Sequence, residues 1–101
     1  MNFAELLDLL TEKYTFLPEW ETGENSFTVS VNEIDVFGYG DTHDEAAEVL
    51  ARAFMEYTEL YFRELAFYRS SMVNRSSHYP YLRRIARCNN NVVKVKKLLG
   101  V

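Results

Sequence analysis

The chain has 101 residues, of which 48% are hydrophobic and 26% are charged, and its net charge is −4. This length and composition allow one small domain with a real core. The apolar runs fall well short of the roughly 20 residues that cross a bilayer, and no signal-peptide pattern opens the sequence, so we expect a cytoplasmic protein without a membrane span. A single cysteine, Cys88, excludes an internal disulfide and a thiolate zinc site, and we expect it to be buried or half-buried.

Charge is distributed unevenly along the chain. Residues 1–60 contain fourteen acidic and two basic side chains, for a net charge of −12, whereas residues 61–101 contain nine basic and one acidic, for +8. Such asymmetry indicates a basic segment that binds nucleic acid or an acidic partner, beside an acidic segment that binds a basic partner. The alternative is that the two parts attract each other within the fold.

The first predicted element is a short amphipathic helix over residues 2–14. Its apolar side chains recur at helical spacing: Phe3, Leu6, Leu7, Leu10 and Tyr14. Pro18 then excludes helix and favours extended backbone before it, which predicts a first strand over residues 15–20.

Two further strands follow in an antiparallel meander. Residues 22–25 are predicted to form a turn. Residues 26–31 alternate apolar and polar side chains, with Phe27, Val29 and Val31 on one face. A short connection at Asn32 and Glu33 leads into a third strand over residues 34–40.

A long helix is predicted over residues 42–68. Asp41 or Thr42 is its N-cap, and Thr42 and Glu45 have the spacing of a capping box. Gly38 and Gly40 precede helix amides, as in phosphate-binding turns. The acidic side chains around the helix start repel a phosphate, however, so this junction is predicted to be architectural.

One broad face of the long helix is apolar and is predicted to cover the sheet. Met55, Phe62 and Arg69 lie between this face and the solvated one, and we expect them to contact a partner protein or a dimer subunit. The alternative is that the N-terminal helix or the C-terminal segment covers Met55 and Phe62. Glu64 falls within the apolar face, which predicts either a bend before it or a pairing with a C-terminal base.

Residues 71–101 change character, with a polar linker, a short helix or turn over residues 80–87, and a last helix over residues 92–99 that ends at Gly100. Tyr79 and Tyr81 next to arginines resemble the stacking and charged surfaces that bind single-stranded nucleic acid. The bases predicted to contact nucleic acid or a protein partner are Arg75, Arg83, Arg84, Arg87, Lys94, Lys96 and Lys97. The alternative is an anchoring segment whose tyrosines and Leu82 pack on the sheet.

No combination of residues indicates catalysis, a cofactor or a metal. His43 and His78 are not spaced with other ligands as metal binding requires. The predicted fold is α+β, with a small antiparallel three-stranded sheet packed against one long helix, an extra N-terminal helix and a short helical C-terminal segment. The expected division is residues 1–70 as an α+β module and residues 71–101 as a basic helical segment.

The runs "YTFLPEW", "GENSFTVSV" and "GYGDTHDEAAEVLARAFMEY" together resemble the core of HicB-like antitoxins over residues 14–61. The matching residues are Gly40, Asp41, Thr42, Glu45, Ala46, Ala53 and Tyr57. Small RelB-like antitoxins are equally similar. The resemblance implies a homodimeric antitoxin of a type II toxin–antitoxin system, which binds a basic, messenger-RNA-cutting toxin and possesses a tail that contacts operator DNA or the toxin. A nucleic-acid-binding module without a toxin, and an adaptor domain, are the competing hypotheses.

Overall fold

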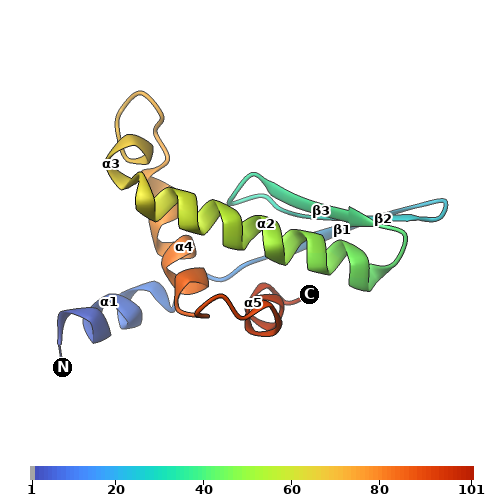
Figure 1. Cartoon of the computed structure of the whole chain (residues 1–101), viewed down its shortest axis with the longest axis horizontal. Helices are drawn as coiled ribbons and strands as arrows, with labels where there is room; N and C mark the ends of the chain where they lie inside the picture. The colour runs from blue at the N-terminus through green and yellow to red at the C-terminus, as the bar shows by residue number, and fades with distance from the viewer. Residues whose placement is uncertain (1) are drawn as a thin grey trace.

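The computed structural model describes residues 2–101 and is an α+β structure (Figure 1). Its elements in chain order are α1 (Phe3–Thr11), β1 (Pro18–Gly23), β2 (Ser26–Val31), β3 (Val36–Gly40), α2 (His43–Arg63), α3 (Leu65–Tyr68), the 3-10 turn η1 (Ser76–His78), α4 (Tyr79–Ala86) and α5 (Val92–Leu99). The predicted class is confirmed: a three-stranded sheet packs against one long helix, with helices before and after it.

The sheet is an antiparallel meander in the order β1-β2-β3. Val29 pairs with Trp20 on one side and with Gly38 on the other, and Val29 and Val31 are fully buried, as their alternation predicts. The first strand begins at Pro18 and continues to Gly23, so it lies later in the chain than the predicted residues 15–20. The turn between β1 and β2 is therefore shorter than predicted and consists of residues 24–25. Asn25 has a φ of 60°, a left-handed conformation that asparagine tolerates well.

The third strand begins at Val36, two residues later than predicted. Ile34 lies in the preceding turn and is completely buried, and its N–H donates to the carbonyl of Val31 at 3.2 Å. Ile34 is therefore apolar because it is a turn residue that packs in the core, and not because it belongs to the strand.

Helix α2 begins with the predicted capping box. The Oγ1 of Thr42 accepts the Glu45 N–H at 3.1 Å, and the Glu45 carboxylate accepts the Asp41 N–H at 2.9 Å. The helix ends at Arg63, since Glu64 leaves helical geometry with φ −115° and ψ 40°. Glu64 is exposed, so the chain bends at this residue and avoids burying an unpaired carboxylate.

Helix α2 is covered on two sides, by the sheet and by α4 and α5 (Figure 1). Leu50 and Phe54 are fully buried, as the apolar face predicts. Ala51 and Thr58 are buried as well, because α4 and α5 cover the adjoining face. Val49, which was predicted on the covered face, is 39% exposed.

The C-terminal helices contribute to the same hydrophobic core as the sheet. Leu82 and Ile85 of α4, and Val95 and Leu99 of α5, belong to one buried cluster with Val29 of β2. Helix α1, in contrast, contacts α4 and leaves Phe3 and Leu10 exposed. Within residues 2–101, no helix is both long and apolar enough to cross a membrane.

Candidate functional site

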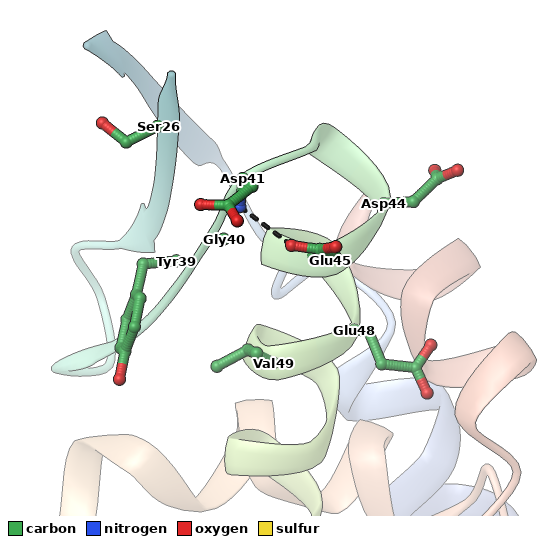
Figure 2. A pocket seen from close by; sticks show the side chains of 8 residues that line it. All are labelled: Ser26, Tyr39, Gly40, Asp41, Asp44, Glu45, Glu48 and Val49. Atoms are coloured by element: carbon green, nitrogen blue, oxygen red, sulfur yellow. Dashed lines mark hydrogen bonds between the residues drawn. The ribbon is translucent and has the colours of Figure 1, made fainter. Parts of the chain in front are cut away.

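A hollow of about 690 Å³ lies between the end of β3 and the first turns of α2 (Figure 2). We call it the acidic groove. Its lining residues come from the strands, the turn before the helix and the helix itself: Ser26, Tyr39, Gly40, Asp41, Asp44, Glu45, Glu48 and Val49. Figure 2 shows Tyr39 and Val49 on the strand side and the helix side of the groove, with Asp41 and Glu45 where strand and helix meet.

Two local features form this groove. Gly40 lets the strand end approach the helix start closely, because a Cβ at this position would lie 2.9 Å from the Ala46 nitrogen and 2.5 Å from the Glu45 Cβ. The capping contacts of Thr42 and Glu45 then fix where the helix begins. The acidic side chains of the first two turns are thereby held next to the strand end.

The electrostatics of the groove are strongly negative. Four of the residues that line it are carboxylates. Within the part of the chain that the structure describes, no basic residue lines it. Glu48 is partly neutralised, since it pairs with Arg52 at 2.8 Å and with Lys96 at 3.7 Å. Asp41 and Asp44 form no ion pair within the described chain, and both are exposed. Ionised carboxylates only accept hydrogen bonds, so the groove suits basic side chains and not phosphates.

The sequence pattern did not predict the part of the groove that the strands provide. The acidic residues around the helix start were recognised, but Ser26 and Tyr39 reach the groove only through strand pairing. A usable signal was present in the uncharged segment "VFGYG", which alternates large apolar residues with glycine. Phe37 and Tyr39 of this strand are 56% and 64% exposed.

The proposed partner-contact residues lie in two different places. Met55 and Phe62 are half-buried and line a second hollow of about 350 Å³ together with Ile85 and Ala86 of α4. The C-terminal segment therefore covers them in part, which is the alternative that the sequence left open. Arg69 lies over the Tyr79 ring at 5.4 Å and lines another hollow, beside α1. A role for these three residues in a dimer stays a prediction.

Most of the predicted nucleic-acid or toxin contacts are engaged within the chain. Arg83 and Arg87 both pair with Asp8 of α1, at 3.3 and 3.2 Å. Arg84 donates to the Tyr14 carbonyl at 2.8 Å. The other members of the set divide into those with internal contacts, Lys96 with Glu48 and Arg75 over the Tyr57 and Tyr68 rings, and the exposed Lys94 and Lys97. Within residues 2–101, three ion pairs, to Asp8 and Glu48, thus join the two charged parts of the chain. Binding of nucleic acid or toxin by these basic residues stays a prediction.

The two tyrosines of α4 are half-buried and pack against neighbouring aromatic side chains. Tyr81 contacts the rings of Tyr14 and Phe16 edge-on, at 5.4 and 5.5 Å between centroids, and burial raises the pKa of its phenol. Tyr79 packs against Phe62 at 5.6 Å. These aromatic contacts are with α2 and with the segment after α1, whereas the anchoring alternative had placed the tyrosines on the sheet.

The remaining candidate groups serve the fold. Cys88 is 8% exposed, and burial raises the pKa of its thiol. His43 lies against the rings of Trp20 and Phe27, at 4.4 and 4.3 Å between centroids. Among residues 2–101, no group of three His, Cys, Asp or Glu side chains is arranged to hold a metal ion.

His78 connects the turn η1 to α2, because the Tyr57 hydroxyl lies 2.6 Å from its Nδ1. Burial lowers the pKa of His78, and the nearby charge of Arg75 lowers it further, against a smaller opposing effect of Asp35. The unfolded chain therefore binds a proton more readily than the folded one when the pH falls below the ordinary value of 6.5. The stabilisation that neutral His78 provides is fully present above that pH and is lost below it.

We expect the urea concentration at the midpoint of unfolding to decrease when the pH is lowered from ~7.5 to ~5. The decrease should be smaller in the His78→Gln variant. Carboxylates titrate in both proteins, so the difference between the two curves isolates His78. Identical pH dependence for His78→Gln and the original chain would contradict this assignment.

The comparisons with known proteins agree with one another on the class of protein. A family model described as the PHD-like antitoxin of RelE/RelB toxin–antitoxin systems matches residues 2–100. A solved structure from Syntrophomonas wolfei subsp. wolfei, described as an antitoxin part of a proposed toxin/antitoxin system, is similar with a TM-score of 0.77 and 21% sequence identity. The match covers 97% of this chain and 70% of that one, and it supports the fold. Among curated proteins, none matches this chain.

The expectation of an antitoxin is confirmed by the family match, which spans nearly the whole chain. The finer choice between a HicB-like and a RelB-like antitoxin stays a prediction. The chain belongs to the PHD-like family of antitoxins from RelE/RelB toxin–antitoxin systems.

Proposed function

We propose that this antitoxin neutralises a basic ribonuclease toxin by binding it, and that the acidic residues 1–60 provide the binding surface. The acidic groove is the observation that carries the proposal. It combines four carboxylates with the exposed apolar side chains of Tyr39 and Val49, and within the described chain no base lines it. A ribonuclease that cleaves messenger RNA needs a basic surface for the phosphate backbone, so the two surfaces are complementary in charge.

The proposed mechanism is occlusion and involves no chemistry in the antitoxin. Complementary potentials accelerate the encounter of the two proteins and orient them. The bound antitoxin then covers the cationic surface that the toxin uses for RNA. This proposal places the protein in the cytoplasm, where the messenger RNA is, and assigns it no enzymatic activity.

The proposed assembly includes a homodimer. Met55 and Phe62 are half-buried, and the hollow that they line with α4 offers a partly apolar contact for a second copy, with Arg69 at a separate position. Light scattering during gel filtration of the purified chain measures this directly, since a dimer doubles the mass of about 11.8 kDa.

Binding of operator DNA by the basic segment, or of nucleic acid generally, is the second candidate function. Lys94 and Lys97 on α5 support it, because both are exposed and form no ion pair within residues 2–101. Arg83, Arg84 and Arg87 support it less, because they are engaged with α1 and Tyr14. Phosphate binding weakens steeply with added salt, so a salt titration of DNA affinity, with Lys94→Gln/Lys97→Gln as the variant, tests this candidate.

Capture of the toxin tests the main proposal. The tagged chain is incubated with a nuclease-treated lysate of its own cells, the retained protein is identified by mass spectrometry, and that protein is then purified alone. We expect a small basic ribonuclease whose cleavage of RNA is abolished by an equimolar amount of this chain. A captured protein that lacks ribonuclease activity, or a ribonuclease that this chain leaves active, would overturn the proposal.

A further inference from the structure

The two edges of the sheet differ in how they are protected. An edge strand presents unpaired backbone N–H and C=O groups, and proteins usually protect such edges with proline, with charged residues or with a covering element. Strand β1 is protected in this way, because it contains Pro18, Glu19 and Glu21. Strand β3 has the sequence VFGYG, with neither a charge nor a proline.

The edge of β3 is also free of other partners in the structure. Within residues 2–101, β3 pairs with β2 alone, and its only other backbone hydrogen bond is a local one from Val36 to Ile34. Helix α2 packs against the inner face of the strand, where Gly38 meets the backbone of Ala46 and Leu50. The helix therefore covers a face of β3 and leaves its edge open.

The outer face of the same strand is apolar. Phe37 and Tyr39 are more than half exposed, and their ring centroids lie 6.4 Å apart. Their neighbours across the β2 pairing are Ser30 and Thr28, which are too small to cover the rings. At the end of the strand, Tyr39 lines the acidic groove together with the carboxylates (Figure 2). Tyr39 is also one ring of the aromatic pair, so this pair adjoins the groove.

Charge determines which occupant fits this surface. Two copies of β3 in antiparallel pairing about Gly38 would place Asp35 of one copy opposite Asp41 of the other, with Glu33 and Asp44 nearby. Like charges directly opposite each other destabilise a strand pair. A basic segment would meet the same carboxylates with favourable charge, and its alternate apolar side chains would cover Phe37 and Tyr39.

We propose that β3 binds an extended, basic segment of a protein partner as a fourth strand, with the basic side chains next to the acidic groove. Main-chain hydrogen bonds to the open edge supply affinity, and the aromatic pair and the carboxylates supply selectivity. The identification of that partner with the toxin rests on the proposed function. The docking mode itself depends only on the edge, the aromatic pair and the charge of the groove.

A synthetic strand peptide tests the docking mode without the toxin. The probe is acetyl-KVRVKV-amide, and binding is followed on the full chain by NMR mapping of amide chemical shifts. We expect shifts at Phe37, Tyr39, Gly40 and Asp44, and affinity that falls with added salt. The same peptide with alternate backbone N-methyl groups should bind at least about tenfold more weakly, because it loses main-chain donors. Equal binding of both peptides, shifts confined to other elements, or no binding at about 1 mM peptide would overturn the proposal.

Variants of the chain separate the contributions of the strand and the charges. Phe37→Lys/Tyr39→Lys places like charge at exposed positions and should abolish peptide binding. Asp41→Asn/Asp44→Asn should weaken binding about tenfold. The control is Glu56→Gln/Glu59→Gln, which removes the same two charges from exposed positions farther along α2 and should leave affinity unchanged. An equal loss in that control would mean that net charge, and not the groove, attracts the peptide, and would overturn the proposal.

The captured toxin distinguishes the two proposals from each other. If the toxin binds Phe37→Lys/Tyr39→Lys as tightly as the original chain, the antitoxin function stands and docking of the toxin at β3 is overturned. If the peptide binds at β3 but no ribonuclease is captured, docking stands and the toxin assignment fails. If the chain is a dimer that Phe37→Lys/Tyr39→Lys converts to a monomer, the occupant is a second copy and the proposal is overturned.

Discussion

Replacing Gly38 with alanine is expected to lower the free energy of unfolding by about 3 kcal/mol, at the upper end of the usual cost of overpacking. A Cβ on Gly38 would collide with the Ala46 carbonyl oxygen and lie 2.5 Å from the Leu50 nitrogen and 2.9 Å from its Cα. These are backbone atoms of α2, so no side-chain rotation relieves the contact. The helix must move away from β3, and the buried contacts of Leu50 and Val29 loosen with it. Urea unfolding followed by circular dichroism measures the change.

Gly23→Ala is the matched control for this prediction. The added Cβ would lie 2.7 Å from the Ser26 hydroxyl, at the exposed turn between β1 and β2. That hydroxyl is the end of a flexible side chain and can rotate away, so we expect a change within about 0.5 kcal/mol. Comparable losses for both glycines would show that strand propensity, and not the approach of α2, determines the result.

Replacing Leu99 with alanine is expected to cost about 3 kcal/mol, a typical value for removing a fully buried leucine. Leu99 is 0% exposed and belongs to the same buried cluster as Val29 and Phe54, although it lies in the last helix of the chain. The prediction therefore tests whether residues 71–101 fold together with residues 1–70. A single, shifted unfolding transition is expected in urea, because one core unfolds as one cooperative unit.

The control is Val93→Ala in the same helix. Val93 is 71% exposed, so its replacement should change the free energy of unfolding by no more than about 0.5 kcal/mol. If Leu99→Ala were equally harmless, the C-terminal helix would not be part of the core. The basic segment would then be free to act as an independent arm.

Local rules predicted much of the fold. Residues 26–31 form a strand because their alternation places Val29 and Val31 on a single face, and β2 has these bounds. The capping box at Thr42 and Glu45 and the C-cap at Gly100, with φ 79°, were readable because capping involves residues within one turn. The errors fell at positions where a distant contact decides. Ile34 looks like a strand residue in the sequence, and only the closing of the core over the turn shows why it is apolar.

The proposed binding surface at the acidic groove and β3 was likewise predictable only in part. The sequence alone shows that the first 60 residues are strongly acidic, that four carboxylates lie at the start of one helix, and that the chain resembles an antitoxin. The predicted antiparallel meander also places β3 at an edge of the sheet, and the strand order confirms this. The exposure of Phe37 and Tyr39 could not be predicted, because it depends on which face of the strand α2 covers.

The tertiary structure also decided how the basic residues are used. Arg83 and Arg87 meet Asp8, and Arg84 meets the carbonyl of Tyr14, 70 positions away in the sequence. Periodicity and capping act between residues a few positions apart, and they are therefore legible in a single sequence. Ion pairs such as these join segments that are far apart along the chain, so they exist only once hydrophobic burial has brought those segments together.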